Sequence, residues 1–190
     1  MILSSKLDRR KKYTQMVLKT SLMKLLKEKQ ISSITIKEIC ERADINRSTF
    51  YSHYSNQYDL LYSVEEEFIE DMVATLSQYN FSKEEEALQM TVKILEYIAE
   101  KSDICRTLLS ENSDIHFQKR GTMITKQFIF KNWITDSKLD QETFEYISLF
   151  VVSGSIHVIK NWLENGMNKT PKEMAEIINN FTNNGLSDIR

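Results

Sequence analysis

A run of polar side chains between residues 47 and 52 has the types and the spacing needed to bind a nucleic acid. Arg47 and Tyr51 are four residues apart, as are Ser48 and Ser52, so an α-helix would place these pairs on one side. An arginine can bond a guanine edge or a phosphate, and hydroxyl groups can bond phosphates or base edges. A tyrosine ring can stack on a sugar or contact a thymine methyl group. A short helix with this face can enter the major groove of DNA when a second helix supports it.

Two helix start signals predict the elements that position this polar run. Thr35 and Glu38 have the spacing of a capping box, and Asn46 is a second N-cap. The apolar residues after the first cap recur at helical spacing, at Ile36, Ile39, Cys40 and Ala43. In the second helix, Phe50 and Tyr54 face inward and belong to the core. The stretch from residue 35 to 54 therefore predicts two short helices joined by a tight turn.

This stretch resembles the DNA-binding domain of the TetR/AcrR family of bacterial transcriptional regulators, over about residues 8–62. The matching residues are Thr35, Ile36, Lys37, Glu38, Ile39, Ala43, Ile45, Asn46, Arg47, Ser48, Thr49, Phe50, Tyr51, His53, Tyr54, Leu60 and Leu61. Two positions depart from the family pattern. Asp44 replaces the usual turn glycine, but aspartate adopts the left-handed backbone more readily than most residues, so we expect the turn to form. Gln57 replaces a lysine that typically contacts a phosphate in the family.

The residue types and the resemblance together predict a DNA-contacting set. Its members are Thr35, Lys37, Asn46, Arg47, Ser48, Thr49, Tyr51, His53 and Gln57. Arg47 is expected to contact a base edge or a phosphate, and Lys37 and Thr35 to anchor the neighbouring strand. The resemblance implies phosphate contacts for His53 and Gln57. For Thr35 and Asn46 the alternative is that their side chains serve as helix caps alone.

Charge is distributed unevenly along the chain. Residues 1–60 hold 12 Lys and Arg against 6 Asp and Glu, a net charge of +6, whereas residues 61–190 hold 13 against 21, a net charge of −8. A polyanion partner at the N-terminal end would explain the asymmetry, and ordinary variation of surface charge is the alternative. The segment Arg9–Lys12 carries four of these cations at the expected start of the first helix. There they would oppose the helix dipole and favour a phosphate contact, with a solvated helix start as the alternative.

Several classes of function are disfavoured by the sequence. Cys40 and Cys105 lie far apart and lack metal-ligand spacing, so we expect two buried free thiols, no metal site and no cofactor. Neither a nucleophile–base signature nor a phosphate-binding glycine loop is present, so we do not expect an enzyme. The chain has no signal-peptide pattern and no apolar run long enough to cross a membrane, which predicts a cytoplasmic protein without a membrane partner.

The remaining pattern predicts an all-α protein of about nine helices. One Pro and four Gly among 190 residues favour long helices. We expect residues 1–55 to form an N-terminal tail, loose over Met1–Leu7, followed by a three-helix head with the helix-turn-helix. Residues 56–190 are expected to form a larger helical regulatory and dimerisation domain, joined to the head by one unbroken helix from about residue 57 to 78.

A long apolar segment near the C-terminus, Phe144–Leu163, predicts a helix buried on two sides. Its Ser, His, Lys and Asn residues argue against a membrane span. Residues 150–175 resemble the C-terminal domain of a TetR subgroup common in Gram-positive bacteria, in which the last two long helices form a four-helix dimer interface. A two-fold dimer also suits two half-sites of an inverted repeat. The candidate interface residues are Phe150, Ser153, Gly154, His157, Trp162, Met174, Ile178 and Phe181.

The larger domain is, in this family, usually a small-molecule sensor. Aromatic and Met side chains that would surround a ligand are Met72, Phe117, Met123, Phe128 and Trp133, with ordinary core packing as the alternative. We therefore expect a homodimeric repressor that a small-molecule effector of unknown identity releases from an inverted-repeat operator. The alternative is a TetR-like activator or regulator whose larger domain docks a protein partner in place of a small ligand.

Overall fold

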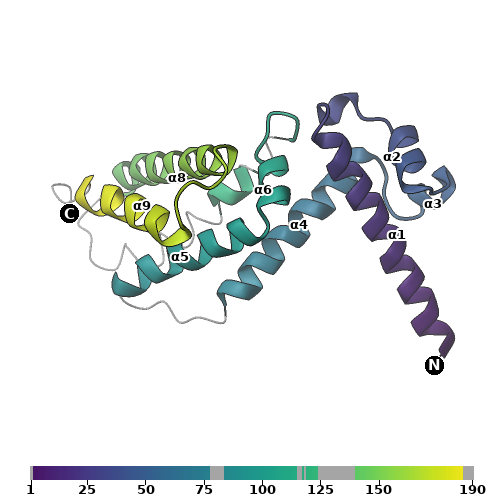
Figure 1. Cartoon of the computed structure of the whole chain (residues 1–190), viewed down its shortest axis with the longest axis horizontal. Helices are drawn as coiled ribbons and strands as arrows, with labels where there is room; N and C mark the ends of the chain where they lie inside the picture. The colour runs from purple at the N-terminus through teal and green to yellow at the C-terminus, as the bar shows by residue number, and fades with distance from the viewer. Residues whose placement is uncertain (1, 78–83, 115–116, 118, 124–139, 186–190) are drawn as a thin grey trace. The chain divides into compact units, whose positions relative to one another are not determined.

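The computed structural model describes residues 2–77, 84–114, 117, 119–123 and 140–185, with side chains from residue 9 onward except at 84–87 and 183–185. Within these ranges the regular structure is helical and no strand occurs, which confirms the predicted all-α fold. The helices shown in Figure 1 are α1 (Ile2–Leu26), α2 (Ile36–Ala43), α3 (Arg47–Tyr51), α4 (Gln57–Leu76), α5 (Glu84–Glu100), α6 (Ser102–Leu108), α8 (Gln141–Glu164) and α9 (Pro171–Gly185). A short 3-10 helix, η1 (Ile31–Ser33), follows α1, and residues 117 and 119–123 are also helical.

The chain folds as two compact units. Unit 1 consists of Met1–Ile69 and Ser110–Asp114, and unit 2 consists of Glu70–Leu109 and Ile115–Arg190. The border between residues 69 and 70 lies within α4, so this helix contributes to both units. The predicted domain border at residues 55/56 lies just before α4. It stays a prediction, because a contact border inside a continuous helix does not show where an independently folding domain ends.

Unit 1 is built on the apolar side of α1, which packs against α2. Its fully buried apolar side chains include Leu18, Leu22, Leu26, Ile34, Ile39, Phe50, Leu60 and Leu61. A polar link also joins α1 to α4, since the Lys19 ammonium donates to the Ser63 carbonyl at 3.3 Å and pairs with Glu67 at 2.6 Å. The short helices α2 and α3 are thus held by the packing of α2 on α1 and of α3 on α2, as expected for helices too short to be stable alone.

The N-terminal end of the chain differs from the sequence-based expectation. The predicted loose tail over residues 1–7 is wrong, because α1 begins at Ile2. This stretch contains no Gly or Pro, so the helix established by the buried Leu18 and Leu22 can extend back through it. The segment Arg9–Lys12 consequently lies about two turns inside the helix. The expected conflict with the helix dipole does not arise, because that effect fades beyond the first turn.

The loop Ser110–Asp114 belongs to unit 1 although it follows α6. The Asn112 side chain donates to the Leu26 carbonyl at 3.0 Å, and the Asn112 carbonyl accepts from the Ile31 N–H at 2.8 Å. Leu26 is the last residue of α1, where helix carbonyls lack intrahelical partners, so Asn112 satisfies one of them. These bonds tie the chain just after α6 to the end of α1, 86 residues away in sequence.

Unit 2 has a core formed mainly by α5, α6, α8 and α9, with α9 packed along α5. Its buried residues include Leu95, Tyr97, Ile98, Cys105, Leu108, Val152, Trp162, Leu163, Met174 and Ala175. Arg106 of α6 donates to the Leu163 carbonyl of α8 at 2.9 Å, and the Tyr97 hydroxyl donates to Asp71 at 2.8 Å. None of the described helices combines the length and the apolar character needed to cross a lipid bilayer.

Candidate nucleic-acid interface

The start of α2 is fixed by the predicted capping box. The Glu38 N–H donates to the Thr35 hydroxyl oxygen at 3.3 Å, and Glu38 Oε2 accepts from the Thr35 N–H at 2.9 Å and from its hydroxyl at 2.8 Å. Glu38 also pairs with Lys29. The hydrogen bonds from Lys29 and Thr35 lower the pKa of Glu38 from 4.5 to about 2. The Thr35 side chain is therefore committed to capping, and its contact with DNA stays a prediction.

The turn between the two helices depends on Asp44. This residue is the C-cap of α2 and adopts φ 54° and ψ 45°, within the left-handed region. Its N–H donates to the carbonyls of Cys40 and Glu41, and the Ile45 N–H donates to the Cys40 carbonyl at 3.0 Å. The expectation that aspartate would support the turn in place of glycine is confirmed, because aspartate visits this region more readily than most residues.

Asn46 caps α3 in the predicted way. Its Oδ1 accepts from the Ser48 N–H at 3.0 Å and from the Ser48 hydroxyl at 3.1 Å. Because the Ser48 hydroxyl donates to Asn46, a phosphate contact through the same proton would require that bond to break. In the structure as it stands, Ser48 can offer DNA the lone pairs of its oxygen.

The side chains of α3 divide between the core and the surface as the sequence predicted. Phe50 is the buried residue of this helix, and its ring lies 5.7 Å from the Tyr51 ring and 5.9 Å from the Tyr54 ring, centroid to centroid. Arg47, Ser48 and Tyr51 are exposed. The aromatic packing under α3 thus fixes the helix and leaves one cation, one hydroxyl and one aromatic ring toward solvent.

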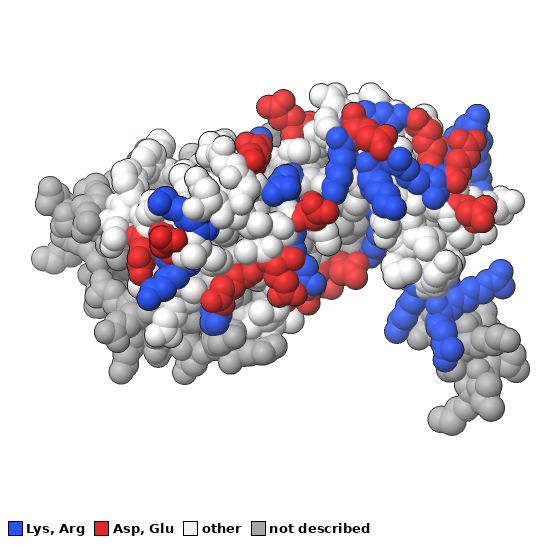
Figure 2. All heavy atoms as spheres, in the orientation of Figure 1, with Lys and Arg blue, Asp and Glu red and all other residues white. Residues whose placement is uncertain are grey.

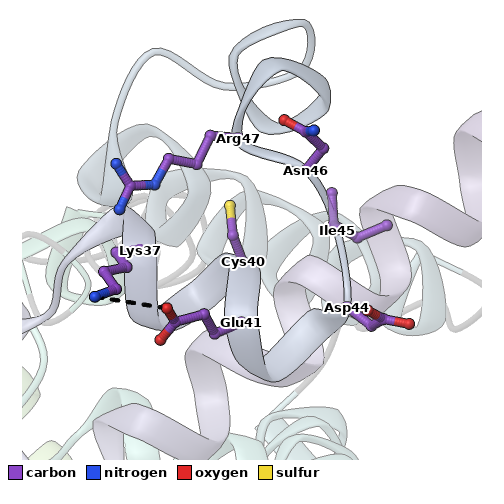
Figure 3. A pocket seen from close by; sticks show the side chains of 7 residues that line it. All are labelled: Lys37, Cys40, Glu41, Asp44, Ile45, Asn46 and Arg47. Carbon is purple, nitrogen blue, oxygen red and sulfur yellow. Dashed lines mark ion pairs between the residues drawn. The ribbon is translucent and has the colours of Figure 1, made fainter.

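Arg47 and Lys37 lie together around a hollow between α2 and α3. The hollow has a volume of about 490 Å³ and is lined by Lys37, Cys40, Glu41, Asp44, Ile45, Asn46 and Arg47. Figure 3 shows the Arg47 and Lys37 side chains on one side of it, with the Cys40 sulfur directed between the two helices. Cys40 is 5% exposed, which confirms the predicted buried thiol, and burial raises its pKa.

Glu41 is a member of this surface that the sequence reasoning missed. Its carboxylate lies 3.7 Å from the Lys37 ammonium, and both side chains are more than 60% exposed. The i,i+4 spacing of the two residues was a usable signal. So exposed a pair contributes little free energy, and Lys37 can exchange Glu41 for a phosphate.

The remaining predicted DNA contacts in and after α3 are half-buried. Thr49 is half-buried, and its carbonyl accepts from the Ser52 hydroxyl at 2.7 Å. His53 is half-buried, and its Nδ1 is enclosed without a hydrogen-bond partner among the described residues, so a phosphate contact would use Nε2. Gln57 is half-buried as the first residue of α4.

The described structure does not test the five candidate ligand-pocket residues as a group. Phe117 is 6% exposed and Met72 is half-buried, whereas Met123 is 57% exposed. Phe128 and Trp133 lie outside the described residues. The described part of the chain therefore neither assembles nor excludes the predicted pocket.

The candidate dimer residues separate into two groups. Phe150 and Phe181 are 67% and 68% exposed, and their ring centroids are 6.4 Å apart. Gly154 and His157 are also exposed on α8, with Ser153 and Ile178 half-buried. In contrast, Trp162 and Met174 are 3% and 5% exposed.

Trp162 and Met174 are buried within unit 2 itself. The Trp162 Nε1–H donates to the Lys169 carbonyl at 2.9 Å and so ties the end of α8 to the following turn. Trp162 and Met174 are therefore part of the core of unit 2. A partner chain would contact the exposed residues Phe150, Gly154, His157 and Phe181.

Two capped helices around a tight turn, with an exposed polar second helix on a buried aromatic base, define a helix-turn-helix protein of the DNA-binding class. Residues 21–64 match the family described as "Bacterial regulatory proteins, tetR family". Residues 85–184, more than half of the chain, match the family described as "Transcriptional regulator C-terminal region". The chain belongs to the TetR family of bacterial transcriptional regulators, as the resemblance of its sequence predicted.

Individual relatives agree with this assignment. The uncharacterized HTH-type transcriptional regulator YxbF of Bacillus subtilis (strain 168) is 34% identical over 84 residues, or 42% of this chain. The match spans about a fifth of that relative's length, 22%. A TetR transcriptional regulator from Streptococcus agalactiae 2603V has a TM-score of 0.73 at 22% identity, covering 94% of this chain and 98% of that one. NalD of Pseudomonas aeruginosa, described as the secondary repressor of the MexAB-OprM multidrug efflux pump, has a TM-score of 0.68 at 15% identity, covering 92% and 97%.

Proposed function

We propose that this TetR-family protein is a homodimeric repressor that binds an inverted-repeat operator and is released from it by a small-molecule effector. The observation that carries the DNA-binding role is the division of α3, where Phe50 is buried and Arg47, Ser48 and Tyr51 are exposed. The proposal assigns the protein to the cytoplasm and assigns it no catalytic activity.

The roles of the two cations at the hollow follow from their positions. Arg47 is the only cation of α3 and lies in its first turn, where a side chain of a recognition helix meets base edges. A bidentate contact with a guanine edge would give it a part in sequence preference. Lys37 lies in the first turn of α2, the supporting helix, and a contact with a phosphate would add affinity without sequence preference.

The dimer part of the proposal is supported by exposed apolar side chains on α8 and α9. These are Tyr146, Leu149, Phe150, Val158, Ile177 and Phe181, each 40% exposed or more. Two phenylalanines 6.4 Å apart form the centre of this surface. Several large apolar side chains left exposed on two packed helices are typical of an interaction site, since water otherwise contacts the rings. A second copy would bury it and would set the spacing of two α3 helices on DNA.

The central experiment is selection of bound duplexes from random-sequence DNA with the full chain. We expect enrichment of an inverted repeat with half-sites one helical turn apart or a multiple of it. Recovery of sequences without any shared motif would remove the regulator assignment. Enrichment of a single half-site would remove the dimer alone.

Two matched variants test the residue roles on the selected duplex and on random DNA. Arg47→Ala should reduce the preference for the selected sequence by about 1–3 kcal/mol. Lys37→Ala should weaken binding to both duplexes equally and reduce the slope of affinity against salt by about 1. Equal losses on both duplexes for Arg47→Ala would exclude its role in sequence preference.

The sign of regulation and the effector are tested with a reporter whose promoter overlaps the selected sequence. We expect lower expression in the presence of the protein, and higher expression would identify an activator. A small apolar molecule that fills a pocket beside Phe117 should restore expression and weaken binding in vitro. Substitution of Phe117 by Ala should change the dose needed without changing operator affinity.

A further inference from the structure

We propose that the segment Arg9–Lys12 of α1 is a second DNA-binding site, separate from α3, that binds phosphates flanking each half-site. The inference rests on the proposed DNA-binding function and extends the interface beyond the helix-turn-helix. The ligand is the sugar–phosphate backbone of duplex DNA, bound without sequence preference.

The first observation is that α1 has no buried side in this region. Arg9, Arg10, Lys11, Lys12 and Tyr13 are all exposed, Tyr13 at 61%. Five consecutive helical residues pass through more than one full turn, so side chains on every side of the helix contact solvent here. Burial begins at Thr14, and Leu18 and Leu22 then hold the later turns in the core. The exposed part of α1 is therefore a rigid extension of a packed helix.

The second observation is the excess of positive charge. Residues 1–27 contain eight Lys and Arg and a single carboxylate, that of Asp8. The described ion pairs of unit 1 use Lys19, Lys29, Lys37 and Arg42, and Arg9, Arg10 and Lys11 take part in none of them. A solvated helix with neighbouring like charges is disfavoured by their repulsion, and an anionic partner removes that cost.

The third observation is the place of the segment within unit 1. The extension of α1 and the helices α2 and α3 belong to the same compact unit. In Figure 1 the N-terminal end of α1 and α3 both reach the right-hand edge of this unit. Figure 2 shows Lys and Arg side chains gathered on the described N-terminal part of α1. Duplex DNA carries one charge per ~1.7 Å of its axis, so a duplex bound at α3 continues as a row of phosphates beyond the half-site.

The test compares binding of labelled random-sequence duplex at several salt concentrations by wild type, Arg9→Ala/Arg10→Ala and Lys11→Ala. Lys24→Ala is the matched control, because Lys24 is an exposed lysine at the other end of α1. Alanine has the highest helix propensity, so these variants keep α1 helical, which circular dichroism verifies. Each lost phosphate contact lowers the slope of log affinity against log salt by about 0.9.

We expect the double variant to lose about two units of slope per bound chain, Lys11→Ala about one, and Lys24→Ala none. Between 50 and 200 mM salt, the wild type should then lose roughly tenfold more affinity per chain than the double variant. Unchanged slopes in the double variant, or an equal change in Lys24→Ala, would overturn the inference. Binding of the segment to anionic lipid vesicles with an unchanged DNA slope would overturn it as well.

A second measurement separates this inference from the proposed function. The duplex enriched by selection is used in two lengths, one ending at the half-sites and one longer by a helical turn at each end. Wild type and Arg47→Ala should prefer the longer duplex, whereas Arg9→Ala/Arg10→Ala should bind both lengths equally. If selection enriches a sequence but the wild type binds its short and long duplexes equally well, the second site is contradicted and the regulator assignment remains intact.

Discussion

The turn of the helix-turn-helix offers a quantitative test through Asp44, whose backbone is left-handed at φ 54° and ψ 45°. Two substitutions remove the same carboxylate but differ in backbone freedom. The left-handed conformation costs an ordinary residue about 1–2 kcal/mol and costs glycine nothing. Glycine in turn loses about 0.5–1 kcal/mol more conformational entropy on folding than alanine.

These values give different stabilities for the two variants. Asp44→Ala should lower the free energy of unfolding by about 1 kcal/mol, because alanine lacks the tolerance of aspartate for this region. Asp44→Gly should remain within about 0.5 kcal/mol of wild type, since relief of strain and loss of entropy nearly cancel. The glycine variant should therefore be the more stable of the two by about 1 kcal/mol, or about 2–4 °C in melting temperature for a chain of this size.

Urea unfolding followed by circular dichroism measures this difference directly. DNA binding supplies an internal control, because Asp44 is exposed at the same hollow as Lys37 and Arg47 and both variants remove its charge. The folded forms of the two variants should thus gain equal affinity for duplex DNA. An alanine variant as stable as the glycine variant would refute the role of backbone conformation at this turn.

Three further predictions concern other parts of the fold. Hydrogen bonds from Lys29 and Thr35 hold the pKa of Glu38 at about 2, so the stability it contributes is complete above about pH 4.5 and is lost as pH falls toward 2. The urea midpoints of wild type and Glu38→Gln should therefore converge over this range, and a constant gap would contradict the linkage. Asn112→Ala removes the 3.0 Å hydrogen bond to the Leu26 carbonyl at the end of α1 and should lower the free energy of unfolding, measured in urea, by about 1 kcal/mol. Asn112→Asp should lower it further, because a carboxylate would face the carbonyl. Unchanged urea midpoints in both variants would exclude this role. Phe181→Glu should convert the proposed dimer to monomer in sedimentation while the helix content stays constant, because this ring is 68% exposed within the chain. A persistent dimer would place the interface elsewhere.

The sequence determined the features that depend on residues three or four positions apart. The capping box of Thr35 with Glu38 and the N-cap at Asn46 both form as predicted. The helical spacing around α3 also placed Phe50 in the core. Such features are predictable because a cap and an apolar stripe are local, and their geometry follows from the helix period alone.

Membership of the family was likewise accessible from residues 35–61, since the motif combines these local signals in one order. The start of α1 could not be predicted from the sequence. The free energy of adding a residue to a helix end is small, so packing elsewhere along the helix can decide where it begins. The predicted tail over residues 1–7 failed for this reason.

The tertiary structure decided which apolar residues are used within the chain. The family resemblance and the apolar character of the last two helices assigned Trp162, Met174 and Phe181 alike to a dimer interface, but packing against the chain's own helices buries the first two and leaves the third exposed. It also decided the bond between Asn112 and the end of α1, which joins positions 86 residues apart. Contacts of this kind depend on how helices pack against one another. The spacing of residues within one helix shows which side is apolar but does not identify the helix or partner that covers it.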